Sequence, residues 1–195
     1  INLTGTFDWT DAGESGDAST SGYTIDKTVT ITGQGRDETF IQADATPDTA
    51  SSRVFTTSGE IILTFNDLTI RYGDTASLYN GGGCIYQAAN ATMNLNSVNI
   101  DNCIAYDGSG GGIYQYSDTV LNIDKSEISN NRAGDGDGGG IHSYNAISLT
   151  MTNSSVYSNY ATGGLSGGGL ELSGTNSSVF TITNSTIYDN EITSG

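Results

Sequence analysis

The stretch GGGIYQYSDTVLNIDKSEISNNRAGDGD, residues 110–137, is followed directly by GGGIHSYNAISLTMTNSSVYSNYATGGLS, residues 138–166. Both stretches begin with a glycine run, continue with an apolar residue and carry an asparagine near the end. Residues 82–109 and 167–195 repeat the pattern, and four consecutive copies indicate a repeat protein with one structural unit per copy. The apolar residues after the glycines stand 28, 28 and 29 residues apart, at Ile85, Ile113, Ile141 and Leu170.

A second column of apolar residues extends the repeat toward the N-terminus. The segment LTFNDLTIRYG, residues 63–73, is a fifth copy without its glycine run, and VTITGQGRDETFIQA, residues 29–43, is a looser copy before it. We therefore expect a repeat domain over residues 24–195. Residues 1–23, with a strand-like start and a polar loop around Trp9, do not fit the repeat and are expected to cap it. The column runs through Ile70, Ile100, Ile128, Val156 and Ile187.

Apolar and polar residues alternate within each copy. In LTMTNSSVYSN, residues 149–159, Leu149 and Met151 alternate with Thr150 and Thr152. A period of two predicts half-buried strands, and no copy has room for a crossover helix as well. The sequence therefore predicts an all-β fold, a parallel β-helix with coils of about 28 residues stacked about 4.8 Å apart.

One polar column is predicted to lie inside the solenoid. Asn131, Asn159 and Asn190 occupy the same position in three copies, where stacked asparagines can bond to each other and to the turn backbone. Cys103 takes this position in the first glycine-led copy. Cys84 lies in the same coil, so the two cysteines form either a disulfide or two buried free thiols.

The blocks GGGIY, GGGIH and GGGLEL, each followed by ISNN, VYSN or IYDN, resemble the repeats of right-handed parallel β-helix surface proteins. The resemblance is to the polymorphic outer-membrane and CSLREA types within the pectate-lyase-like superfamily, and it covers residues 24–195. It implies a right-handed solenoid on a secreted or surface-anchored protein. Adhesins, lyases, hydrolases and inert spacers all use this fold, so the function must be argued from the site.

The net charge and the hydropathy of the chain limit the kinds of partner that it can bind. The formal net charge of −16, with 6 Lys plus Arg against 22 Asp plus Glu, argues against nucleic-acid binding. No apolar run is long enough to predict a membrane-spanning helix. Gly195 falls where another glycine run is due, so we expect a fragment of a longer solenoid, or end-to-end packing on another chain.

The stretch GDGDGGG, residues 134–140, invites a calcium hypothesis. Asp135 and Asp137, with Asp107 one coil earlier, could supply oxygen ligands to Ca²⁺. The nine-residue glycine–aspartate repeat of calcium-binding β-rolls is absent, however, so the sequence favours a solvated turn and no cofactor. Phosphate binding is disfavoured because neither a helix N-terminus nor a lysine follows the glycines.

The single histidine and several tyrosines are the candidate ligand-binding residues. His142 shares a column with Tyr86, Tyr114 and Glu171, so His142 and Glu171 are predicted neighbours on adjacent coils. Such a pair can be an acid–base dyad or half a metal site, although a surface ladder pair is favoured. The outward tyrosines form predicted stacks that could bind glycans; they are Tyr86, Tyr114, Tyr157 and Tyr188.

Two alternatives to a structural or adhesive role remain at this stage. A polysaccharide lyase or hydrolase needs clustered carboxylates, whereas the column containing Arg71 and Asp101 predicts one ion pair only, so a non-catalytic role is favoured. An ice-binding solenoid needs regular threonine ranks. Only two adjacent coils carry Thr-x-Thr, and Asp124 interrupts the array; the threonines are Thr150, Thr152, Thr181 and Thr183.

Overall fold

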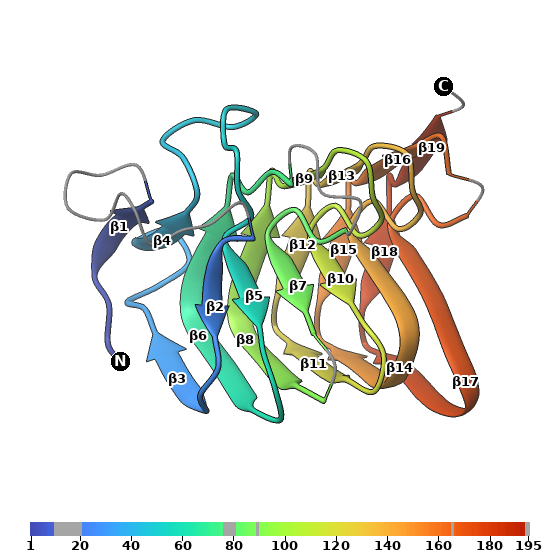
Figure 1. Cartoon of the computed structure of the whole chain (residues 1–195), viewed down its shortest axis with the longest axis horizontal. Coiled ribbons are helices and arrows are strands. Elements are labelled where there is room, and N and C mark those ends of the chain that lie inside the picture. The colour runs from blue at the N-terminus through green and yellow to red at the C-terminus, as the bar shows by residue number, and fades with distance from the viewer. Residues whose placement is uncertain (10–20, 76–80, 89, 165, 194–195) are drawn as a thin grey trace.

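The computed structural model describes residues 1–9, 21–75, 81–88, 90–164 and 166–193. Within these ranges the chain forms strands and no helix. The strands of successive coils lie side by side along the long axis of the molecule, with the two termini at opposite ends (Figure 1). The pairing between coils is parallel throughout the described ladders, as expected for a parallel β-helix.

The first ladder follows the glycine runs and holds the anchor residues of the repeat. Ile85, Ile113, Ile141 and Leu170 are register partners on consecutive coils, which confirms the spacing read from the sequence. Its strands are β2 (Tyr23–Ile25), β5 (Phe55–Thr57), β7 (Ile85–Gln87), β10 (Ile113–Gln115) and the starts of β14 (Ile141–Thr152) and β17 (Leu170–Thr183).

The second ladder contributes two inward residues from each coil. Leu95, Ile123 and Met151 stack in register and are fully or almost fully buried, because alternation turns every second side chain inward. The strands are β3 (Val29–Thr32), β11 (Val120–Asp124), the first halves of β6 (Ile62–Arg71) and β8 (Thr92–Asp101), and the later parts of β14 and β17.

The third ladder begins after a bend in the long strands. Asp67 and Ser97 have positive φ, 51° and 55°, where β6 and β8 turn from the second ladder into the third. Ile70, Ile100 and Ile128 are the buried column here. The strands are β1 (Gly5–Asp8), β4 (Thr39–Gln42), the second halves of β6 and β8, β12 (Glu127–Ser129), β15 (Ser155–Tyr157) and β18 (Thr186–Tyr188).

A short fourth ladder closes each later coil. Ala105, Ala133 and Ala161 are fully buried register partners in it. Small side chains suit this position because the chain turns tightly here before the next glycine run. The strands are β9 (Ile104–Ala105), β13 (Arg132–Ala133), β16 (Tyr160–Thr162) and β19 (Glu191–Thr193).

The first eight residues lie in the same ladders as the coils. Asn2 bridges Thr32 in the second ladder, and β1 pairs with β4 in the third. The strand-like alternation of INLTGTF explains this, because it presents apolar side chains at the spacing of the ladder. Trp9 packs on Tyr23, with ring centroids 4.5 Å apart; most of the polar loop expected beside it lies outside the described residues.

Two polar columns hold two successive corners of each later coil: asparagines lie between the third and fourth ladders, and serines lie between the second and third. Asn131 N–H donates to Asn159 Oδ1 at 3.0 Å, and Asn159 N–H donates to Asn190 Oδ1 at 3.1 Å. The side-chain amides also bond along the column and to backbone carbonyls, which confirms the predicted asparagine stack. Ser126, Ser154 and Ser185 form a matching column, each accepting a backbone N–H from the preceding coil.

A disulfide joins Cys84 to Cys103, and both residues are fully buried. In the next coil the equivalent positions are Gly112 and Asn131, and a Cβ on Gly112 would lie 3.1 Å from the Asn131 amide. The disulfide therefore replaces a glycine–asparagine contact. Cys103 still joins the polar column, since its N–H donates to Asn131 Oδ1 at 3.0 Å.

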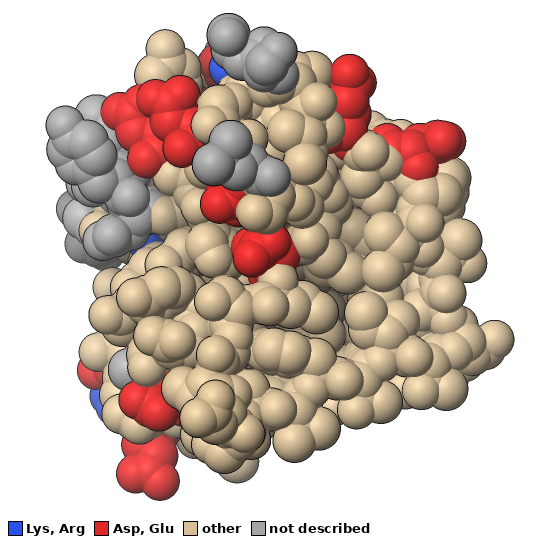
Figure 2. All heavy atoms as spheres, turned by 90° about the vertical axis from the view of Figure 1, so that its right-hand side faces the viewer, with Lys and Arg blue, Asp and Glu red and all other residues tan. Residues whose placement is uncertain are grey.

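The last described coil has exposed inward side chains. Ile182, Ile187 and Ile192 are 41%, 46% and 45% exposed, although their partners one coil earlier are buried. Figure 2 views this end and shows Asp and Glu mainly around its rim, with uncharged residues across most of the surface.

Candidate functional site

The outward side chains of the first ladder form an aromatic surface, which we call the tyrosine face; it consists of Tyr86, Tyr114, Tyr116, His142 and Tyr144. Each anchor residue points inward, so the next residue in the strand points outward. Tyr86, Tyr114 and His142 are register partners in consecutive coils, as predicted, and Glu171 follows them. Tyr116 and Tyr144 form a second column two residues further along each strand.

The tyrosine rings stack on one another along the solenoid. Tyr86 and Tyr114 are 4° from parallel, with ring centroids 5.5 Å apart, and Tyr116 and Tyr144 are 15° from parallel at 5.9 Å. Arg53 lies over the Tyr86 ring, with its guanidinium carbon 5.0 Å from the centroid. Each ring therefore turns a face toward a neighbour, leaving ring edges and hydroxyl groups toward solvent.

The tyrosine hydroxyls are free to act as hydrogen-bond donors. Among the described residues, none of the four hydroxyls has a protein hydrogen-bond partner, and none belongs to the buried unpaired atoms. Burial raises the pKa of Tyr86 and, with the neighbouring tyrosines, raises the pKa of Tyr114 to about 12. These two phenols stay protonated at neutral pH.

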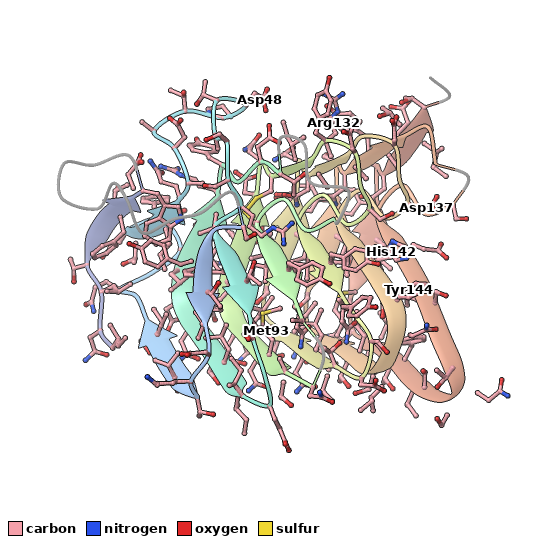
Figure 3. All side chains as sticks on the ribbon, viewed as in Figure 1. Asp48, Met93, Arg132, Asp137, His142 and Tyr144 are labelled. Atoms are coloured by element: carbon pink, nitrogen blue, oxygen red, sulfur yellow. A yellow bond between two sulfur atoms is a disulfide. The ribbon has the colours of Figure 1, made fainter. Side chains whose placement is uncertain are left out.

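His142 contacts the rings of Tyr114 and Tyr144 and forms no ion pair with Glu171, its register partner. It meets Tyr114 edge-on at 5.2 Å and Tyr144 at 6.4 Å, and its Nδ1 is buried without a partner in the described part of the chain. Burial lowers the pKa of His142, opposed by Asp137. Burial and Asp137 raise the pKa of Glu171. Figure 3 shows Asp137, His142 and Tyr144 following one another along one side of the molecule.

Of the three aspartates considered for calcium, Asp137 has hydrogen bonds that join the turns of neighbouring coils. Asp137 Oδ1 accepts the N–H of Ser166 at 2.8 Å, and the Asp137 N–H donates to Ser109 Oγ at 3.0 Å. Asp135 is exposed, and Asp107 is half-buried. No group of three His, Cys, Asp or Glu side chains in the described ranges is arranged to hold a metal ion.

Tyr157 and Tyr188 lie on a different face from Tyr86 and Tyr114. They stack at 5.1 Å on the outside of the third ladder, where the Tyr157 hydroxyl donates to Glu127 at 3.0 Å. Glu127 also pairs with Arg36 at 2.9 Å. The four predicted tyrosines therefore form two separate pairs, because Tyr86 and Tyr157 occupy different positions of the repeat.

The ion pair predicted between Arg71 and Asp101 is not formed, although the two residues are register partners. Arg71 Nε donates to Gln42 at 2.8 Å, and its guanidinium lies 4.0 Å from the centroid of the Phe40 ring. Asp101 instead accepts hydrogen bonds from Ser129 and two neighbouring asparagines. The prediction was wrong because an aromatic ring and an amide oxygen on the preceding coil satisfy the arginine.

The outside of the second ladder carries two long columns of threonine, asparagine and aspartate. Asn122 donates to Asn94 at 2.9 Å and Thr152 to Asp124 at 2.8 Å, so many of these groups bond to each other along the columns. Thr30 and Thr64 extend the rank beyond the coils considered in the sequence. The ice-binding hypothesis for this face stays a prediction.

Sequence reasoning missed Tyr116, Tyr144 and Arg53. The two tyrosines stand two residues after Tyr114 and His142 in consecutive copies, so the alternation rule places them outward on the same face. That signal was available in the sequence. Arg53 belongs to an irregular segment before β5, where no repeat position predicts its contact with Tyr86.

The fold and this face define a repeat solenoid with an outward aromatic surface. A family model described as the right handed beta helix region matches residues 52–195, more than half of the chain. The chain belongs to the right-handed β-helix family.

No curated protein matches the chain, and no solved structure matches it either. Among the described residues, no helix has the length and apolar character needed to cross a membrane.

Proposed function

We propose that the chain is a non-catalytic segment of an extracellular surface protein that acts as a rigid spacer and binds glycans through its tyrosine face. The observation that carries this proposal is the set of four tyrosine hydroxyls, unpaired within the described residues and reachable from solvent. Glycans are rich in hydroxyl and ring oxygens, which accept hydrogen bonds from phenols.

Three further features support the extracellular role. Disulfides persist mainly in oxidising compartments, and Cys84 and Cys103 are joined by one. The strongly acidic composition suits an exposed, soluble surface. The resemblance of the glycine-led blocks to polymorphic outer-membrane repeats points the same way. A continuous core shared by all coils suits the spacer role, because no coil can move without breaking contacts to its neighbours.

A glycan array tests the binding, and an assay for released sugar tests the absence of catalysis. We expect retention of at least one glycan and no new reducing ends or unsaturated sugars. The double variant Tyr114→Phe/Tyr116→Phe removes two hydroxyls while keeping the rings, and should weaken binding. The matched control Tyr157→Phe/Tyr188→Phe changes the other face and should bind as the wild type does. Released product, or no bound glycan, would contradict the proposal.

A further inference from the structure

We infer that the ligand of the tyrosine face is an uncharged polysaccharide lying along the solenoid axis, held by tyrosine hydroxyls and not by stacking on the rings. This inference rests on the proposed function and specifies its ligand. It follows from three properties of the face: the covered ring faces, the unpaired hydroxyl groups and the local charge.

The covered faces of the Tyr86 and Tyr114 rings leave little room for the usual stacking of a sugar on an aromatic side chain. Tyr114 lies against Tyr86 and, at 6.2 Å and 22°, against Tyr116, while Tyr144 turns one face toward Tyr116. The Arg53 guanidinium also lies over the Tyr86 ring, 5.0 Å from its centroid. A ligand therefore meets the edges of the stacked rings, where the hydroxyl groups are.

The hydroxyl groups repeat along the solenoid axis. Tyr86 and Tyr114 come from neighbouring coils, as do Tyr116 and Tyr144, so each column offers a donor about every 4.8 Å. A linear polymer with an oxygen acceptor on every unit matches such a row better than a compact molecule does. Binding should strengthen from a monosaccharide to a short oligosaccharide and then level off, because the row spans three coils.

Local charge decides between a neutral and an anionic polymer. The chain carries a net charge of −16, and the carboxylates of Asp137 and Glu171 lie beside His142. Arg53, the cation beneath Tyr86, is 3% exposed and so offers little to a ligand in solvent. The lowered pKa of His142 keeps its ring neutral at neutral pH. An anionic polysaccharide would be repelled here, within a screening length of about 8 Å at physiological salt.

Affinity electrophoresis of the whole chain can separate the two ligand classes. The uncharged probes are galactomannan, xylan and amylose, and the anionic probes are polygalacturonate and alginate, each at low and at high salt. We expect retardation by an uncharged polysaccharide, unchanged by salt, and no retardation by either anionic one at low salt. Tyr114→Phe/Tyr116→Phe should weaken binding by about 5-fold to 150-fold, the loss expected for two hydrogen bonds. Tyr157→Phe/Tyr188→Phe should leave it unchanged.

The possible failures are distinguishable. Retardation by an anionic polysaccharide that weakens as salt rises would overturn the inference and leave the proposed glycan binding intact. Binding that survives Tyr114→Phe/Tyr116→Phe but is lost in Tyr114→Ala would show stacking and would also overturn it. Retardation by neither class would refute the inference and the proposed function together. Circular dichroism of each variant checks that the solenoid is folded.

Discussion

Replacing Asn159 with leucine tests whether the asparagine column holds the coils together. The Asn159 side chain is almost completely buried and bonds in both directions along the column. Its Oδ1 accepts from the backbone N–H and the side-chain amide of Asn131, each at 3.0 Å. Its Nδ2 donates to Ile128 O at 2.9 Å and to Asn190 Oδ1 at 3.0 Å. Leucine has a similar size but can make none of these bonds.

The expected loss of stability comes from the partners left without a hydrogen bond. Asn131 loses an acceptor for its buried backbone N–H, and Ile128 loses a donor to its carbonyl. An unsatisfied buried group costs about 1–3 kcal/mol. Two such groups give a loss of about 2–6 kcal/mol in the free energy of unfolding. That is a large part of the 5–15 kcal/mol or so by which a typical domain is stable.

Urea unfolding followed by circular dichroism measures this loss, with Asn122→Leu as the matched control. Asn122 donates to Asn94 on the half-buried outside of the second ladder, where water can replace the lost bond. The control should therefore change stability by less than about 1 kcal/mol. If Asn159→Leu cost no more than Asn122→Leu, the reasoning that buried polar columns join the coils would be refuted.

Three further predictions concern the disulfide, the close packing at Gly139 and the pKa of His142. Cys84→Gly/Cys103→Asn restores the pair found in the next coil and should unfold at higher urea than Cys84→Ser/Cys103→Ser, which should lose about 3 kcal/mol. Gly139→Ala places a Cβ 2.3 Å from the Gly168 carbonyl oxygen and should cost about 3 kcal/mol or more, measured as a lower thermal midpoint. The pKa of His142 is lowered in the folded state from its usual 6.5, so the stability this group contributes is present above that value and is lost as pH falls below it. Between about pH 7.5 and about pH 5 the thermal midpoint of the wild type should fall further than that of His142→Tyr, and an equal fall would contradict this.

The fold could be predicted from the sequence because the sequence is a repeat. Because the copies stand 28 or 29 residues apart, aligning them also aligned the ladders, and the register of Ile113 with Ile141 followed directly. The same alignment placed Asn131, Asn159 and Cys103 in one internal column. These features involve only a coil and its immediate neighbour. The repeat predicts them because it shows which residues occupy equivalent positions in neighbouring coils.

The site was less predictable because several of its contacts do not follow the repeat. The alignment shows which residues share a column, but the angle at which the chain bends determines which columns share a face. Tyr86 and Tyr157 were both predicted as outward glycan-binding candidates, and they lie on different ladders. Arg36 reaches Glu127, 91 residues further along the chain, from a turn between β3 and β4 that has no counterpart in the later copies. Arg71 found a partner on the preceding coil instead of the following one.

The hydrogen bonds of the serine and asparagine columns all run in one direction along the solenoid. The coil of residues 82–109 and the two coils after it donate backbone N–H groups to the serine and asparagine of the following coil. Only the coils from residue 110 on also offer a serine and an asparagine of their own to the preceding coil, because Val98 and Cys103 take these positions in the first glycine-led coil. Ser126 and Asn131 are five residues apart, as are Ser154 and Asn159, so one short segment supplies both acceptors. A gene duplication of one coil would bring its own acceptors and still complete its neighbours. A coil that carries both acceptors can therefore be added or removed during evolution without leaving the hydrogen bonds of these two columns incomplete.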